Sequence, residues 1–188
     1  VCGGIAAANW PEEVEMLRAE LKRVFYVEKA DVVNDCVIAL RAGTDSDNAI
    51  VLCTGSGMNS AVFVNGKPEL VYNNYIDLYD QGSEGLGARA FQTVFESHMG
   101  CRPSTSLTGR LMDHFGIHEM DRLMLAFYRN RLPKPLKDVA QIVFEEAAHN
   151  EPAALEIIYR FGKSISRYVT GAVERFGVDP AEFRVILS

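Results

Sequence analysis

Three polar clusters in this sequence combine residue types that could do chemistry. In the first, the apolar pair Val32-Val33 is followed by Asn34-Asp35, which places a carboxylate where a predicted strand ends and a helix begins. Open α/β sheets bind ligands at the carboxyl ends of their strands, so Asp35 could act as a general base toward a bound hydroxyl group. The local alternative is an N-cap, in which Asn34 or Asp35 accepts a hydrogen bond from the first turn of the helix.

The second cluster is the stretch Cys53-Thr54-Gly55-Ser56-Gly57, which follows the apolar run Ala49-Ile50-Val51-Leu52. Glycine lets a backbone approach a ligand closely, and hydroxyl and N–H groups donate hydrogen bonds to anionic oxygens. The stretch could therefore hold a phosphate group. The simpler alternative for this stretch alone is a hairpin turn between two strands.

The third cluster is Tyr79-Asp80-Gln81-Gly82-Ser83, which precedes a long predicted helix. A carboxylate held at a helix start could accept hydrogen bonds from the hydroxyl groups of a polyol. The local alternative for Asp80 is an N-cap combined with an Asx-type turn.

The elements that must position these clusters form an α/β half followed by a helical block. The hydrophobic pattern predicts helices over residues 11–21 and 36–42, with Asn9 capping the first helix. It predicts strands over 31–33, 49–53, 60–64 and 70–72, and Asn65-Gly66 as the hairpin turn between the last two. Five helical segments follow, over 85–99, 107–115, 120–128, 135–149 and 152–176, with Leu111, Phe115, Leu123 and Phe127 as core residues. An apolar strand over 183–188 then returns the chain to the sheet. This order predicts a helical block inserted into a sheet domain, with the ligand between them.

Composition narrows the classes of protein that are compatible with the sequence. The 188 residues are 48% hydrophobic and 23% charged, which is typical of a globular chain. A net charge of −6 without a basic run argues against nucleic-acid binding, and the lack of an apolar stretch of roughly 20 residues argues against a membrane span. Four scattered cysteines without a CxxC pair, and the absence of a signal-peptide pattern, predict a reduced cytoplasmic protein without a metal site. Both ends of the sequence have the character of strands, which predicts a piece of a larger protein.

The order of the three clusters resembles the BadF/BadG/BcrA/BcrD ATPase family, and within it the N-acetylglucosamine kinases of the sugar kinase/Hsp70/actin superfamily. "VVNDCVIALRAG" is similar to the family's strand–Asp–helix segment, and "VLCTGSG" to its Gly-Thr-Gly-Ser phosphate loop. "DQGSEGLGARAFQTVF" is similar to its Asp-x-Gly-Ser helix. "PSTSLTGRLMDHFG" and "VAQIVFEEAAHNEPAALEIIYRFGKSI" resemble its helical block, and "VILS" resembles the strand before its adenosine-binding turn.

The resemblance implies an α/β chain of the ribonuclease H-like actin/Hsp70/sugar kinase fold, with two lobes that close on ATP and a sugar. It implies residues 1–48 as the end of an N-terminal lobe, and 49–188 as a C-terminal lobe with hairpin strands over 49–72 and the helical block over 82–176. Asp35 would be the catalytic base. Thr54, Gly55 and Ser56 would bind phosphate, and Lys137 would contact the nucleotide. Asp80 would bind the sugar, and Mg²⁺ would arrive with the nucleotide rather than in a protein cage.

The sequence also departs from the family pattern. Cys53 replaces the first glycine of the phosphate loop, and Tyr72-Asn73-Asn74-Tyr75 replaces a Gly-Gly-Trp-Gly-like segment. Asn73 and Asn74 could bind a polyol other than N-acetylglucosamine. The N-terminal Asp-Gly-Gly-Gly-Thr loop and the C-terminal adenosine turn of the family are absent from the sequence.

The leading hypothesis is therefore an ATP-dependent carbohydrate kinase, with a small-molecule sugar as substrate and a homodimer as the common assembly of such kinases. The first alternative is a non-catalytic sensor that binds a sugar or nucleotide. The second is a BadF-type ATPase coupled to electron transfer, a branch whose bridging iron–sulfur cysteines find no counterpart in these scattered cysteines.

Overall fold

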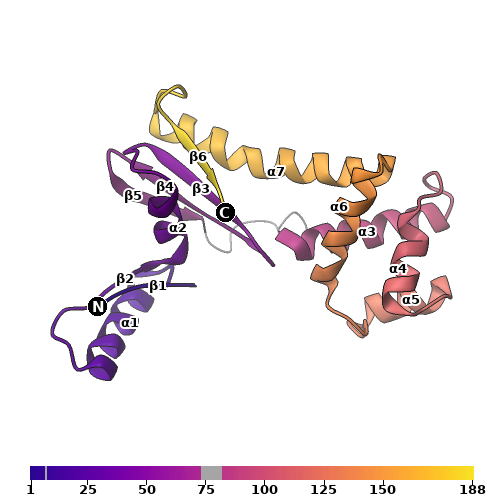
Figure 1. The fold of residues 1–188 in the computed structure, drawn as a ribbon, viewed down its shortest axis with the longest axis horizontal. Coiled ribbons are helices and arrows are strands. Elements are labelled where there is room, and N and C mark those ends of the chain that lie inside the picture. Colours follow the sequence, from indigo (N-terminus) through magenta and orange to yellow (C-terminus); the bar gives the residue numbers. More distant parts are fainter. Residues whose placement is uncertain (7, 73–81) are drawn as a thin grey trace. The chain divides into compact units, whose positions relative to one another are not determined.

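The computed structural model describes residues 1–6, 8–72 and 82–188, and for 69–72 the backbone alone (Figure 1). The chain divides into two compact units. The first comprises Val1–Thr54, Met58–Ile76 and Ser166–Ser188, and the second comprises Gly55–Gly57 and Asp77–Ile165.

The described part of the first unit contains two sheets, two complete helices and the C-terminal part of α7 (Pro152–Phe176). In the smaller sheet, β1 (Cys2–Ile5) pairs in parallel with β2 (Asp31–Asn34), and α1 (Pro11–Phe25) connects them. The larger sheet has the strand order β5-β4-β3-β6. Its strands are β3 (Ala49–Thr54), β4 (Met58–Val64), β5 (Lys67–Tyr72) and β6 (Arg184–Leu187). The β3–β4 and β4–β5 pairs are antiparallel, whereas β6 returns from the helical block to lie parallel to β3.

Helix α2 (Asp35–Gly43) packs against the larger sheet. Its buried residues Cys36 and Leu40 form one apolar cluster with Ala49, Val51, Ala61 and Phe63 of the sheet. The central strand β3 is buried from Ala49 to Leu52, as expected for an apolar strand with neighbours on both sides. This packing places the start of α2, and therefore Asp35, next to the sheet.

Two local details differ from the sequence-based predictions. The N-cap of α1 is Trp10 rather than Asn9, because the carboxylate of Glu13 accepts the N–H groups of both residues, at 3.0 Å from Asn9 and 3.1 Å from Trp10. Strand β5 begins at Lys67, not at residue 70, because the chain pairs directly after the turn. Pro68 pairs with Phe63, and Glu69 is the extra residue of a bulge opposite Val62/Phe63. The predicted Asn65-Gly66 turn is confirmed, with φ of 49° and 75° at these two residues.

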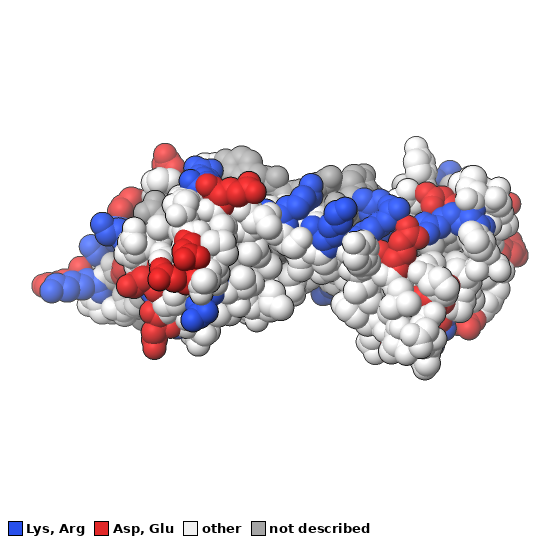
Figure 2. Space-filling model, turned by 90° about the horizontal axis from the view of Figure 1, so that it is seen from above, with Lys and Arg blue, Asp and Glu red and all other residues white. Residues whose placement is uncertain are grey.

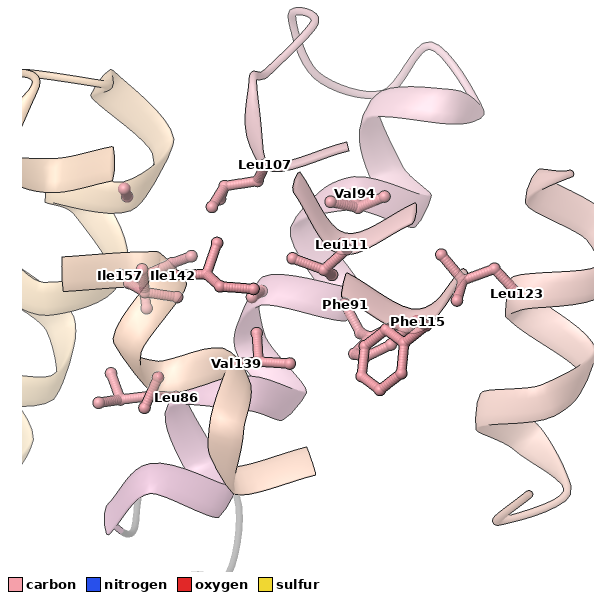
Figure 3. Packing of buried hydrophobic residues seen from close by; sticks show 14 of the residues in the cluster. Leu86, Phe91, Val94, Leu107, Leu111, Phe115, Leu123, Val139, Ile142 and Ile157 are labelled. Carbon is pink, nitrogen blue, oxygen red and sulfur yellow. The ribbon is translucent and has the colours of Figure 1, made fainter. Parts of the chain in front are cut away.

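The second unit is helical and has its own apolar core. Its elements are α3 (Gly82–His98), α4 (Leu107–Phe115), α5 (Met120–Tyr128), the 3₁₀ helix η2 (Leu136–Asp138), α6 (Val139–Ala148) and the first part of α7 (Pro152–Phe176). Figure 3 shows side chains of the core, with Leu111, Phe115 and Leu123 from successive helices pointing inward. Phe91 of α3 stacks on Phe127 at a ring distance of 4.5 Å. The four predicted core residues therefore belong to this core, with Phe127 partly buried against it.

The segment predicted as one helix over 135–149 is divided in the structure. Pro135 is extended, η2 forms one short turn, and α6 starts only at Val139. Among the residues that the structure describes, no helix is both long and apolar enough to cross a membrane.

Candidate functional site

Asp35 is the first residue of α2 and follows directly on β2. The preceding residue, Asn34, is the N-cap: its side-chain oxygen accepts the N–H of Cys36 at 2.9 Å. The Oδ1 atom of Asp35 also lies 2.9 Å from the N–H of Cys36, and the Asp35 side chain is exposed. The cap belongs to Asn34, which leaves the carboxylate of Asp35 facing solvent at a strand's carboxyl end.

The stretch Thr54–Gly57 is the connection of a β-hairpin. Thr54 ends β3 and pairs with Met58, the first residue of β4. The N–H of Thr54 donates to the carbonyl of Ser188 at 2.8 Å, and the N–H of Gly55 donates to the carbonyl of Gly57 at 2.9 Å. The hairpin geometry is therefore confirmed, and phosphate binding by this connection stays a prediction. The Gly55 N–H that was expected to reach a phosphate is engaged inside the turn, whereas the hydroxyl-bearing residues Thr54 and Ser56 are exposed.

The strand that carries Asp35 and the hairpin that carries Thr54 are joined by side chains. Asn59 of β4, which pairs with Cys53 in register, donates from Nδ2 to the Oδ1 atom of Asn34 at 3.3 Å. Cys36 and Cys53 also pack in one apolar cluster. Burial, with the neighbouring Cys53 thiol as a further cause, raises the pKa of the Cys36 thiol, so Cys36 stays uncharged at neutral pH.

In the second unit, the hairpin tip and Lys137 both lie along the first turns of α3. The N–H groups of Ser83 and Glu84 donate to the carbonyls of Gly55 and Ser56, at 2.9 and 3.1 Å. Further along α3, Gly87 lies so close to the carbonyl of Leu136 that a Cβ atom there would overlap with it. Positions 82 and 87 of a helix are separated by about 7.5 Å along its axis. Lys137 of η2 is exposed and directly follows Leu136, the residue that packs on Gly87.

The three predicted sugar-binding residues, Asn73, Asn74 and Asp80, lie outside the described residues. The helix that Asp80 was predicted to precede begins at Gly82, three positions earlier than the helical pattern indicated. Sequence reasoning missed Asn59 and misassigned Asn9 as a helix cap, although both contribute amides that contact Asn34, the residue before Asp35. A polar residue within the apolar strand Met58–Val64 was the available signal for Asn59.

The second unit also contains a polar cavity of about 160 Å³ between α3 and α7, which no predicted site residue lines. Two of its arginines are paired with its acids: Arg102 contacts Glu96 and Glu156, and Arg160 contacts Glu156 at 2.7 Å. Figure 2 shows acidic side chains beside basic ones over this unit. No group of three or more potential metal ligands occurs among the His, Cys, Asp and Glu residues that the structure describes.

The strand order and the helical block define the class of fold. The chain has a mixed α/β fold that matches solved structures of the sugar kinase/actin-like ATPase fold, as predicted. It superposes with a TM-score of 0.65 on a Chromobacterium violaceum protein described as an N-acetylglucosamine kinase, covering 100% of this chain and 63% of that one at 16% identity. A ROK family glucokinase from Streptomyces griseus, solved with glucose and AMPPNP, gives a TM-score of 0.55 at 13% identity over 91% of this chain and 55% of its own.

Sequence comparison adds relatives with named activities, although the chain matches no family model. It is 26% identical over 167 residues to the glucosamine kinase GspK of Vibrio cholerae, covering 88% of this chain and 56% of that protein. It is 25% identical over 146 residues to an N-acetylmuramic acid/N-acetylglucosamine kinase of Clostridium acetobutylicum, covering 76% of this chain and 46% of that protein. The chain thus spans about half the length of these relatives, and both are sugar kinases. The narrower resemblance to the BadF/BadG/BcrA/BcrD branch stays a prediction.

Proposed function

We propose that this chain is part of an ATP-dependent sugar kinase that acts on an amino sugar or a related hexose. The observation that carries the proposal is the link between Asn34 and Asn59, which ties the exposed carboxylate of Asp35 to the hairpin that bears Thr54. The fold shared with sugar kinase structures and the two sugar kinase relatives support the same proposal. A general base beside a phosphate loop is the minimum that phosphoryl transfer requires of a protein.

In the proposed reaction, the carboxylate of Asp35 accepts the proton of one sugar hydroxyl group. The oxygen of that hydroxyl forms a bond to the γ-phosphorus of ATP, and the bond between the γ-phosphorus and the β,γ-bridging oxygen breaks. The products are a sugar phosphate, ADP and the proton held by Asp35. Because Asp35 is exposed at a strand end, substrate can reach it without rearrangement of α2.

Phosphate oxygens would be held by the hydroxyl groups of Thr54 and Ser56 and by the ammonium group of Lys137. Hydroxyls and a cation suit an anion. The proposal is supported by the exposure of all three residues, with Thr54 and Ser56 in the hairpin connection and Lys137 next to Leu136, which packs on α3. The N–H of Gly55 closes the turn by donating to the carbonyl of Gly57, so Gly55 would not bind phosphate through this group. Mg²⁺ bound to the nucleotide would neutralise charge on the transferred phosphoryl group. Asp80, Asn73 and Asn74 remain the proposed sugar-binding residues.

The proposal is tested by measuring ADP release from the full-length protein with Mg-ATP and a panel of amino sugars and hexoses. We expect sugar-dependent release, and a loss of several orders of magnitude in Asp35→Asn with sugar binding retained in calorimetry. The matched control is Asp31→Asn, which neutralises an exposed carboxylate at the opposite end of β2. Sugar binding without any ADP release would point instead to the non-catalytic sensor, and wild-type turnover in Asp35→Asn would refute the base assignment.

A further inference from the structure

The side chain of Asn34 makes more contacts than a helix cap needs. It is 3% exposed. Its oxygen accepts two hydrogen bonds, from the N–H of Cys36 at 2.9 Å and from Nδ2 of Asn59 at 3.3 Å. Its own Nδ2 group donates to Oδ1 of Asn9 at 2.7 Å. A capping residue uses only its acceptor, so the two contacts to other amides require a separate explanation.

These amides connect three segments that are distant in sequence. Asn9 precedes α1, Asn34 ends β2, and Asn59 lies in β4 opposite Cys53. All three belong to the first compact unit. The middle amide is buried, whereas Asn9 and Asn59 at its two sides are partly exposed. The three side-chain amides of Asn9, Asn34 and Asn59 therefore form a row that runs through the interior between the smaller sheet and the β3–β4 hairpin.

The position of the row bears directly on the proposed chemistry. Asp35 is covalently next to Asn34, and Thr54 follows Cys53, the pairing partner of Asn59. A shift of Asn34 relative to Asn59 would therefore change the separation between the carboxylate of Asp35 and the hydroxyl of Thr54. Buried amides are held in one orientation by their hydrogen bonds, because an unpaired buried donor or acceptor is unfavourable.

We propose that Asn34 is a positioning residue, held by Asn9 and Asn59, that fixes the Asp35 carboxylate relative to the phosphate-binding hairpin. The inference rests on the proposed kinase function, because it assigns a role in that reaction. Asn34 touches neither reacting group. Its expected effect is therefore on turnover, through the placement of Asp35, rather than on substrate affinity.

The first test is Asn34→Ser assayed as a kinase in the full-length protein. Serine keeps an oxygen that can cap α2 but is too short to hold both neighbouring amides. We expect kcat to fall about tenfold to a hundredfold, since misplacement of a reacting group by about 1 Å has effects of that size. KM for sugar and for ATP should stay close to wild type, whereas the thermal unfolding midpoint should fall because two partly buried hydrogen bonds are lost. A residue with a merely structural role would lower the midpoint in the same way but leave kcat per folded molecule unaltered.

The matched control is Asn48→Ser. Asn48 also bridges two segments of the larger sheet, because its Oδ1 atom accepts the N–H of Asn65 at 3.0 Å, but it does so at the opposite end of β3 and β4. Loss of this contact should leave kcat unchanged. An equal drop of kcat in Asn48→Ser and Asn34→Ser would overturn the inference, because it would show a general effect on the sheet.

The second test is Asn59→Ala, alone and combined with Asn34→Ser. Asn59 is partly exposed, so this variant keeps the inference testable if Asn34→Ser fails to fold. If both residues act through one row, the double variant should lose little more turnover than Asn34→Ser alone. Multiplicative losses would overturn the inference. A wild-type kcat in Asn34→Ser, combined with an inactive Asp35→Asn, would overturn the positioning role of Asn34 but leave the kinase proposal intact. An active Asp35→Asn would overturn both the positioning role and the assignment of Asp35 as the base.

Discussion

The backbone N–H of Ser83 donates to the carbonyl oxygen of Gly55 at 2.9 Å, which joins the start of α3 to the tip of the β3–β4 hairpin. The next N–H of the helix, from Glu84, donates to the carbonyl of Ser56. The first N–H groups of a helix have no partner within it, so the hairpin satisfies donors that α3 would otherwise leave unpaired. In return, the helix fixes the backbone of the proposed phosphate loop.

Gly82 makes this junction possible, and we expect Gly82→Ala to damage it. The residue has a φ of 52°, and a Cβ atom would overlap with the carbonyl groups of Gly55 and Gly57. The substitution should cost more than the roughly 1–2 kcal/mol of an L-residue in the left-handed region, because the loop must also move. Chemical denaturation should show this loss of unfolding free energy, and the KM for ATP should rise.

Gly116→Ala is the matched control for that variant. Gly116 also has a positive φ, of 63°, but a Cβ atom there would meet no other atom within 4 Å. Gly116→Ala should lose only the unfolding free energy that an L-residue costs at a positive φ, and its KM for ATP should be unchanged. Equal effects in the two variants would show that the contact with the loop carbonyls contributes nothing.

The Thr54 hydroxyl provides a direct test of phosphate binding by the hairpin. Thr54→Val keeps the shape of the side chain but removes the donor, and a hydrogen bond to a charged group is worth about 1.5–3 kcal/mol. We expect kcat/KM for ATP to fall about tenfold to a hundredfold in steady-state assays. Thr54→Ser, which retains the hydroxyl, should stay within a few-fold of wild type. If valine and serine behave alike, the hydroxyl does not contact the nucleotide.

Much of the fold could be predicted because local patterns and tertiary packing agree. The run Ala49–Leu52 is apolar throughout and becomes the buried central strand, and Asn65-Gly66 forms the turn that its residue types favour. Helix starts were less predictable. Glu13 reaches back to two backbone N–H groups and thereby makes Trp10 the cap, and Pro135 delays α6 until Val139.

The candidate site was only partly readable from the sequence. Asp35 and Thr54 stand at the ends of apolar strands, and this local signal sufficed to select them. The contact between Asn34 and Asn59 depends on β4 lying beside β2, which no local pattern specifies. Likewise, the N–H of Gly55 is engaged by a carbonyl two residues away, so its availability depends on the turn conformation that the hairpin adopts.

His114 should make the stability of the helical unit depend on pH. Burial lowers the pKa of its imidazole from the ordinary value of 6.5, the charge of Lys134 lowers it further, and Asp138 opposes the shift. The unfolded chain therefore binds the proton more tightly than the folded one. The unfolding free energy should fall as the pH drops below about 6.5, until the lower folded pKa is passed.

We expect His114→Gln to lose less stability than wild type when the pH is lowered from 7.5 to 5.5 in denaturant titrations. His118→Gln, in an exposed histidine outside this environment, is measured alongside as the matched variant. A wild-type pH dependence in His114→Gln would show that another group controls this transition.

Leu111 tests whether the helical unit depends on its own apolar core. Its side chain is 0% exposed and belongs to the cluster that includes Phe91 and Phe115. Leu111→Ala should lower the unfolding free energy by about 2–5 kcal/mol, because it removes buried methyl groups and leaves a cavity. Leu125→Ala, in the neighbouring helix α5, changes a side chain in a residue that is 46% exposed and should cost only about 0.5 kcal/mol or less. Similar losses in the two variants, measured by urea denaturation, would contradict the packing described for this unit.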